Sequence, residues 1–294
     1  FIREHAVTDS EVPFFLYTAY SAPHWPLHAP EEDIRKYQGR FSAGWDRLRE
    51  ERLERMRTMG IVDEAWPLTK RDWSQLPWDD ASDKAWQERR MEVYAAQIDR
   101  MDQGIGRIVA ALKETNQIDN TLILFLADNG ACAEEFAPAA KPLPSNNPAG
   151  ITHTRDGKTI LRGNDPSIMP GAEDTYQSYG VPWANLSNTP FREYKHWVHE
   201  GGIATPLIAH WPSVIDQIGT LRHQPGQLTD IMATCLDVAN AEYPKELNGN
   251  DILPLEGTSL APIFRGEHNH KEALIWEHLS LIHISEPTRL RRIS

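Results

Sequence analysis

The clearest periodic pattern in the chain lies between residues 83 and 115, where apolar residues recur at steps of three or four. The stripe consists of Met91, Tyr94, Ile98, Met101, Ile105, Ile108 and Leu112. This spacing puts the apolar side chains on one face and predicts a long helix packed against a core. Residues 122–126 are apolar without interruption and predict a strand that is buried on both faces. A helix followed by such a strand is typical of an α/β fold.

Shorter patterns predict the remaining elements. Residues 13–20 are apolar and rich in aromatic residues, so they predict a buried strand, and residues 206–210 predict a further apolar strand. Apolar residues between 30 and 59 recur mostly at helical steps, but a longer step from Leu48 to Leu53 breaks the phase. One kinked helix and two helices therefore both fit that stretch. Residues 228–241 predict a further helix.

Two stretches have no period. Residues 66–83 are rich in Pro, Asp and Trp and predict an irregular surface loop. From residue 131 to about residue 189 the chain consists mostly of Gly, Pro, Asn, Ser and Asp. A loop of that length inside a domain is usually functional or disordered.

Composition and charge exclude several classes of function. The chain has 294 residues with 30 Lys and Arg against 42 Asp and Glu, which gives a formal net charge of −12. Such an acidic balance argues against a nucleic-acid partner, and no apolar run approaches the roughly 18 residues that span a membrane. Two cysteines exclude a disulfide-dense scaffold and a multi-cysteine zinc module.

Candidate metal ligands follow the predicted strand at residues 122–126. Asp128 and Asn129 offer a carboxylate and an amide oxygen, which are hard ligands suited to Ca²⁺ or Mg²⁺. In open α/β sheets, ligands bind beyond the carboxyl ends of the strands. The Asn129-Gly130 dipeptide also favours a simple turn, which local sequence alone makes the better interpretation.

Two further side chains could contact an anion. His24 lies in a proline-rich loop after the first predicted strand, where an imidazole could protonate a leaving group. Lys195 precedes Gly201-Gly202, and its ammonium could hold a sulfate or phosphate as a point charge. Taken singly, a surface histidine and a solvated lysine are the commoner interpretations.

Six stretches together resemble the formylglycine-dependent sulfatases (arylsulfatases) of the alkaline-phosphatase-like superfamily. They are residues 14–30 (FFLYTAYSAPHWPLHAP), 44–49 (GWDRLR), 94–108 (YAAQIDRMDQGIGRI), 120–130 (NTLILFLADNG), 183–206 and 228–241. They follow the family's order over nearly all of residues 13–278. The resemblance implies an α/β fold in which helices sandwich a mixed sheet, incomplete at both ends of this chain.

The resemblance also implies roles for single residues. Asp128 and Asn129 match the later pair of ligands for the family's active-site calcium. His24 matches a histidine that contacts the sulfate ester and its leaving oxygen, and Lys195 matches a lysine that binds the sulfate. Three residues near Lys195 are further candidates for substrate contact: Trp183, Asn185 and His199.

The family's nucleophile has no counterpart in this sequence. It is a Cys or Ser, oxidised to formylglycine, within a Cys/Ser-x-Pro/Ala-x-Arg motif, and neither Cys132 nor Cys235 begins such a motif. The family's early pair of calcium-binding Asp residues is missing too, as are the Lys and His that follow the nucleophile. The resemblance places all of these upstream. We therefore expect a fragment of a calcium-assisted sulfatase that acts on aryl sulfates or sulfated carbohydrates, with no activity when isolated.

The resemblance also suggests boundaries and a compartment. Residues 1–272 would be the C-terminal part of the catalytic domain, and residues 273–278 the start of a small C-terminal subdomain. Residues 279–294 resemble the translation of a transposase-based sequencing adapter, so we set them aside as a non-native tail, with a genuine basic tail as the alternative. A periplasmic or secreted location follows from the resemblance alone.

Two other functions fit part of the sequence. A phosphodiesterase or phosphonate hydrolase would share the superfamily fold, and the residue at the nucleophile position would distinguish it from a sulfatase. A non-catalytic, glycan-binding relative would use the Trp-rich loops to hold a carbohydrate. The presence of Asp128, Asn129, His24 and Lys195 argues against a decayed site.

Overall fold

The computed structural model describes residues 1–147, 149–267, 274–278 and 281–285. The chain divides into two compact units. Unit 1 comprises Phe1–Thr115 and Gly130–Ile203. Unit 2 comprises Asn116–Asn129 and the described residues from Ala204 onward.

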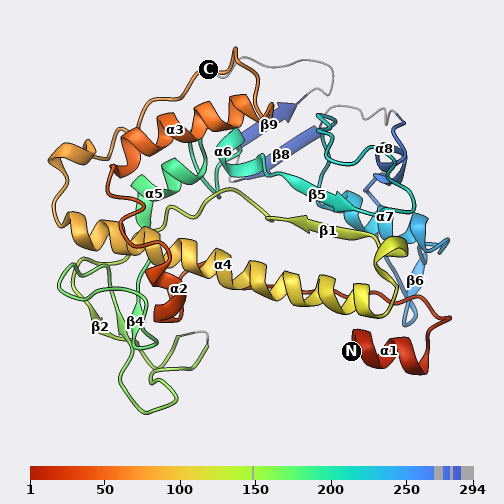
Figure 1. Ribbon diagram of the computed structural model, residues 1–294, viewed down its shortest axis with the longest axis horizontal. Coiled ribbons are helices and arrows are strands. Elements are labelled where there is room, and N and C mark those ends of the chain that lie inside the picture. Colours follow the sequence, from red (N-terminus) through yellow and green to blue (C-terminus); the bar gives the residue numbers. More distant parts are fainter. Residues whose placement is uncertain (148, 268–273, 279–280, 286–294) are drawn as a thin grey trace. The chain divides into compact units, whose positions relative to one another are not determined.

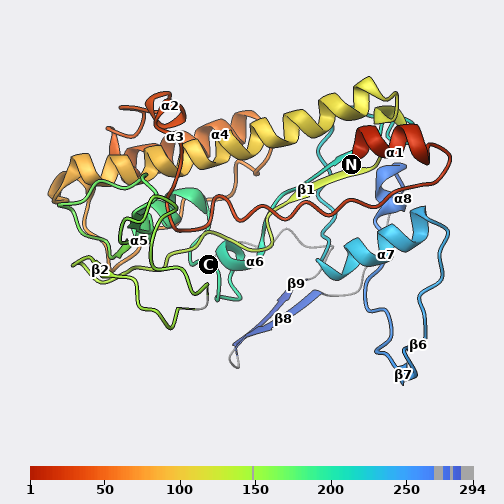
Figure 2. The ribbon, with the colours of Figure 1, turned by 90° about the horizontal axis from the view of Figure 1, so that it is seen from below.

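Unit 1 is built along one long helix, α4 (Lys84–Glu114), which confirms the helix that the apolar stripe predicted. Helix α2 (Glu31–Arg35) lies against α4 in both Figure 1 and Figure 2. Helix α3 (Gly44–Thr58) packs on α5 (Gly180–Ser187). Residues 30–59 therefore form two helices rather than one kinked helix, separated by turns at residues 36–43. The longer step from Leu48 to Leu53 lies inside α3 and does not mark the boundary between the helices.

Smaller elements complete unit 1. The helical ones are α1 (Ile2–Thr8), the 3-10 turn η1 (Trp78–Asp80) and α6 (Glu200–Ile203). A three-stranded mixed sheet has the order β2 (Lys141–Pro142), β3 (Leu161–Arg162) and β4 (Thr175–Tyr176). Strand β3 pairs antiparallel with β2 and parallel with β4.

An aromatic cluster forms the core of unit 1. The Trp183 side chain is completely buried, and its ring centre lies 5.4 Å from that of Trp45 and 5.9 Å from that of Trp78. Other buried members come from α4 and from the segments beside it: Leu27, Ile34, Met91, Val93, Ala96, Tyr179 and Tyr194. Aromatic pairs at such distances add to the stability that burial of their area supplies.

Unit 2 contains a two-stranded antiparallel sheet. Strand β1 (Ile123–Leu126) pairs with β5 (Leu207–His210), so that Ile123 lies opposite His210. The 3-10 turn η2 (Ile118–Asn120) precedes β1, and helices α7 (Thr229–Val238) and α8 (Ala261–Phe264) follow β5. Two hairpins pair β6 (Glu246–Leu247) with β7 (Asn250–Asp251) and β8 (Leu274–His278) with β9 (Leu281–Ser285) (Figure 2).

The predicted strand at residues 13–20 is wrong. This segment joins none of the described sheets, and the Phe15 and Tyr17 side chains are 74% and 80% exposed. An apolar run indicates that a segment could be buried in a sheet. A strand also requires a neighbouring strand whose backbone N–H and C=O groups can pair with its own. At its end, the Tyr20 hydroxyl lies against Gly104 of α4.

Two other expectations need correction. The strand predicted at residues 122–126 exists as β1, but it is not buried on both faces, because β5 is its only partner among the described residues and Phe125 is 40% exposed. Residues 131–189 are not one continuous loop, since they contain β2, β3, β4 and α5. Helix α5 is short and buried, so it shows no alternation of apolar and polar residues.

The remaining expectations concern membranes and the C-terminus. None of the helices in the described part of the chain combines the length and the hydrophobicity that a membrane crossing requires. Of the stretch set aside as a tail, residues 281–285 form β9, and the others lie outside the described residues. The origin of that stretch stays a prediction.

Candidate functional site

The fold of unit 1 brings His24 and Lys195 together, although 171 positions separate them. The Lys195 Nζ atom lies 3.2 Å from His24 Nε2 and 3.1 Å from a carboxylate oxygen of Glu134. Trp25 and Cys132 complete this group. We call these five residues, His24, Trp25, Cys132, Glu134 and Lys195, the Lys195 cluster.

The segment after Gly130 places Cys132 and Glu134 in the cluster. Ala131 and Ala133 pack against the aromatic core, so in an extended segment the alternate side chains, Cys132 and Glu134, point to the opposite side. The Ala131 carbonyl accepts a hydrogen bond of 3.1 Å from the Lys195 backbone N–H, which fixes the two segments side by side.

Asn188, directly after α5, ties the same segments together. Its side-chain oxygen accepts from the Ala131 N–H at 2.9 Å, and its amide group donates to the carbonyls of Glu193 and Gly201. The backbones approach closely here, since the Gly130 N–H donates to the Gly202 carbonyl at 2.9 Å. A Cβ atom at Gly130 would collide with the Gly201 carbonyl, so the close approach requires glycine.

Both ring nitrogens of His24 have a hydrogen-bond partner. Its Nδ1 lies 2.9 Å from the Trp25 carbonyl oxygen, which can only accept, so Nδ1 carries the hydrogen. Its Nε2 faces the Lys195 ammonium, which can only donate, so Nε2 presents its lone pair. The Nε2 atom of His24 can therefore accept a hydrogen bond.

Glu134 is the most connected member of the cluster. One carboxylate oxygen accepts from Lys195, and the other accepts from the Trp25 indole N–H at 2.6 Å. Burial opposes ionisation of Glu134, but the hydrogen bonds from Lys195 and Trp25 outweigh it and lower the pKa of Glu134 to about 2. Burial likewise disfavours the Lys195 ammonium, yet its hydrogen bond to Glu134 prevails and raises the pKa of Lys195. Both groups are therefore charged at neutral pH.

Cys132 is a half-buried thiol in the same cluster. Its Sγ accepts a hydrogen bond of 3.2 Å from the Trp25 indole N–H, and burial raises the pKa of the thiol. Cys132 and Cys235 are both free cysteines. Sequence reasoning did not select Cys132 or Glu134 as site residues. No motif marks them, and only the folded chain brings them beside His24 and Lys195.

Asp128 and Asn129 belong to unit 2, directly after β1. Asp128 is exposed and Asn129 half-buried. Among the residues that the structure describes, no side chain pairs with the Asp128 carboxylate, so its oxygens are available to a hard cation. The donor set, one carboxylate and one amide oxygen, fits part of a calcium site.

The three further candidates for substrate contact lie elsewhere in unit 1. Trp183 is completely buried, and its indole N–H donates to the Gln87 carbonyl at 2.9 Å. Asn185 is 2% exposed. A substrate could touch these two side chains only if the core opened. The His199 ring stacks on Trp197.

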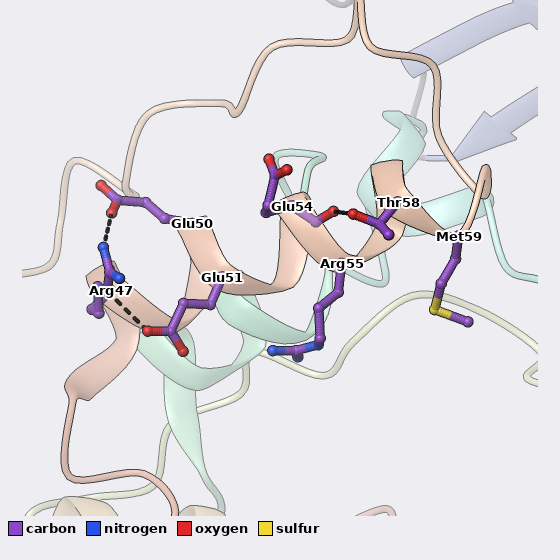
Figure 3. Close-up of a pocket in the computed structure, with 7 residues that line it drawn as sticks. All are labelled: Arg47, Glu50, Glu51, Glu54, Arg55, Thr58 and Met59. Carbon is purple, nitrogen blue, oxygen red and sulfur yellow. Dashed lines mark hydrogen bonds and ion pairs between the residues drawn. The ribbon is translucent and has the colours of Figure 1, made fainter.

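A hollow on the exposed side of α3 is lined mainly by charged residues (Figure 3). Arg47 pairs with Glu51 at 2.9 Å and with Glu50 at 3.5 Å. The Thr58 hydroxyl donates to the Glu54 carbonyl at 2.9 Å. These contacts pair the polar groups with neighbours on the same helix, as is usual on a solvated helix face. None of the site residues predicted from the sequence lines the hollow.

Comparison with known proteins identifies the family. The profile described as "Sulfatase" matches residues 3–241. An uncharacterised sulfatase of Schizosaccharomyces pombe is 32% identical over 265 residues, which cover 88% of this chain and 45% of the relative. The arylsulfatase of Klebsiella aerogenes is 30% identical over 272 residues, which cover 90% of this chain and 54% of the relative. The chain thus spans about half the length of the curated relatives it matches.

Solved structures agree on the fold. The crystal structure of Ps i-CgsB superposes on 93% of this chain, and on 40% of its own, with a TM-score of 0.50 and 23% identity. This likeness fits the predicted α/β fold of the alkaline-phosphatase-like type. Because the family profile covers most of the sequence, the chain belongs to the sulfatase family.

Proposed function

We propose that this chain carries the sulfate-binding side chains and part of the calcium site of a sulfate ester hydrolase. The observation that carries the proposal is the convergence of His24 and Lys195, two residues distant in sequence, on one charged cluster. Family membership gives the reaction class, and the cluster gives residues suited to it.

The chemistry of sulfate esters explains why these side chains suit the reaction. Hydrolysis develops negative charge on the sulfuryl oxygens and on the leaving oxygen. The Lys195 ammonium has three donors, which face Glu134, His24 Nε2 and the Cys132 thiol, so a sulfate oxygen would replace the contact to His24 or to Cys132. His24 presents a lone pair at Nε2, so it must take up a proton before it can donate to the leaving oxygen.

Asp128 and Asn129 would hold the calcium ion, which as a Lewis acid would polarise a sulfate oxygen. The family's formylglycine nucleophile has no counterpart at Cys132 or Cys235, so the proposal gives neither cysteine that role. His199 remains a proposed substrate contact. Aryl sulfates and sulfated carbohydrates are the proposed substrates, and the periplasm or the cell exterior is the proposed location.

Sulfate binding tests the proposal directly. We expect inorganic sulfate to raise the melting temperature of the 294-residue chain, because a ligand that binds only the folded state stabilises it. The variant Lys195→Ala should lose this response, whereas Lys113→Ala, which removes an exposed lysine of α4, should keep it. An equal response in Lys195→Ala and the parent chain would contradict the proposal.

An activity assay tests the missing nucleophile. We expect the 294-residue chain to release no phenol from an aryl sulfate, because its sequence lacks the nucleophile motif. Turnover that survives repurification and disappears in Lys195→Ala would show that another residue of this chain serves as nucleophile.

A further inference from the structure

We infer that the Lys195 cluster is also a binding site for a thiophilic divalent metal ion such as Zn²⁺. The ligands would be His24 Nε2, Cys132 Sγ and a carboxylate oxygen of Glu134. This site is distinct in residues and in chemistry from the proposed calcium ligands Asp128 and Asn129. It shares His24 and Lys195 with the proposed sulfate site, but metal binding is measured independently of any activity.

The geometry of the donors supports this assignment. The nitrogen, sulfur and oxygen atoms all lie within 4.8 Å of one another. Zinc prefers such a mixed set at about 2.0–2.3 Å, which places tetrahedral ligands roughly 3.3–3.8 Å apart. Small side-chain rotations therefore close the set around an ion. Three protein ligands would leave a fourth position for water or another ligand.

The surroundings of the donors also resemble those of a metal site. Histidine ligands usually donate their second ring N–H to a carbonyl or a carboxylate, which fixes the ring and the tautomer. His24 Nδ1 makes this contact with the Trp25 carbonyl at 2.9 Å. The Trp25 indole N–H contacts both other donors, Cys132 Sγ at 3.2 Å and Glu134 Oε2 at 2.6 Å. One residue thus orients all three ligands.

A cation already occupies this environment. The Lys195 ammonium contacts all three donor groups, His24 Nε2, Glu134 and the Cys132 thiol. A divalent ion would bind the same lone pairs, while the Cys132 thiol releases its proton to solvent and Lys195 moves away still protonated. The metal ion and the Lys195 ammonium therefore compete for the same donor atoms.

The chemistry of the two proposed metal sites separates them. Asp128 and Asn129 offer only oxygen, which suits calcium, whereas a thiolate and an imidazole select softer ions. Excess Ca²⁺ should therefore leave the Lys195 cluster available to Co²⁺ or Zn²⁺. This difference allows each site to be titrated in the presence of the other metal.

Cobalt titration of the 294-residue chain, with excess Ca²⁺ present, tests the inference. We expect a near-ultraviolet thiolate-to-cobalt charge-transfer band at one equivalent of Co²⁺. The band should persist in Cys235→Ser, the matched control, and disappear in Cys132→Ser. The absence of a band from the parent chain, or its persistence in Cys132→Ser, would overturn the inference.

A second measurement avoids reliance on variants. Alkylation of Cys132 by iodoacetamide, mapped by mass spectrometry, should slow when Zn²⁺ is added, while alkylation of Cys235 provides the internal reference. Equal slowing of both thiols, or of neither, would contradict the site.

The variant Lys195→Met separates this inference from the proposed function. It should abolish the sulfate response and yet raise the affinity for Zn²⁺ about fivefold, the change that corresponds to the loss of a competing ion pair of about 1 kcal/mol. Loss of the sulfate response without any Zn²⁺ binding would leave the sulfate site standing and reject the metal site. Zn²⁺ binding with an unchanged sulfate response would do the reverse.

Discussion

The Lys195 cluster and the Asp128–Asn129 pair differ in how their charges are balanced. In the cluster, Glu134 accepts from Lys195 and Trp25, and the histidine already has partners on both ring nitrogens. Asp128 is exposed, and within the described part of the chain no side chain pairs with its carboxylate. The first region holds its charges with its own counter-charges, whereas the second leaves its charge for an external cation.

This difference determines what each region contributes to stability. A carboxylate that is paired in the folded state stabilises that state, and the cluster also rests on the aromatic core through Ala131 and Ala133. An exposed, unpaired carboxylate contributes little until its cation binds. Substitutions should therefore damage the cluster region strongly without any ligand, and the pair only when a ligand is present.

The largest expected effect comes from the core beneath the cluster. Replacing the completely buried Trp183 by alanine should lower the free energy of unfolding by about 3–5 kcal/mol, the usual cost of emptying a large aromatic site. Urea unfolding measures the loss, and Trp73→Ala is the matched control because that side chain is 95% exposed. A cost below about 1 kcal/mol would show that Trp183 is not a core residue and would restore it as a substrate contact.

The next effect tests the counter-charge in the cluster. The folded-state pKa of Glu134 is lowered to about 2. The ionised carboxylate therefore stabilises the folded chain above the ordinary pKa of a glutamate, and this stabilisation is lost as the pH falls from about 4.5 toward 2. Glu134→Gln should cost about 1–2 kcal/mol at pH 7, a linkage value reduced for screening because the side chain is 35% exposed.

Urea unfolding over pH 3–7 measures this dependence. The parent chain and Glu134→Gln should differ most at neutral pH, and the difference should shrink to roughly 40% of that value by pH 3, because the folded-state pKa of Glu134 is about 2. Glu64→Gln, at an exposed position, should follow the parent throughout. A difference that stays constant with pH would mean that packing rather than charge explains the cost.

The same contrast explains which features the sequence predicts. The α4 stripe predicts its helix because a period of 3.6 is a local property, and β5 and α7 are confirmed for similar reasons. Pairing is not local, so residues 13–20 suit a strand but lack a partner among the described residues. Family resemblance proposes His24 and Lys195, whereas Glu134 joins them only through the alternation of residues 131–134 over the core.

The smallest effect tests the exposed pair. Without calcium, Asp128→Asn should change the free energy of unfolding by less than about 0.5 kcal/mol, because it removes no contact within the described chain. With Ca²⁺ at a concentration equal to the dissociation constant, the parent chain should gain about 0.4 kcal/mol, and the variant should lose this gain. Thermal unfolding with and without Ca²⁺ measures both, and Asp119→Asn is the control at an exposed position of the same segment.

A full calcium response in Asp128→Asn would place the calcium ligands elsewhere. A large loss of stability without calcium would show that the pair, like the Lys195 cluster, is part of the structural network.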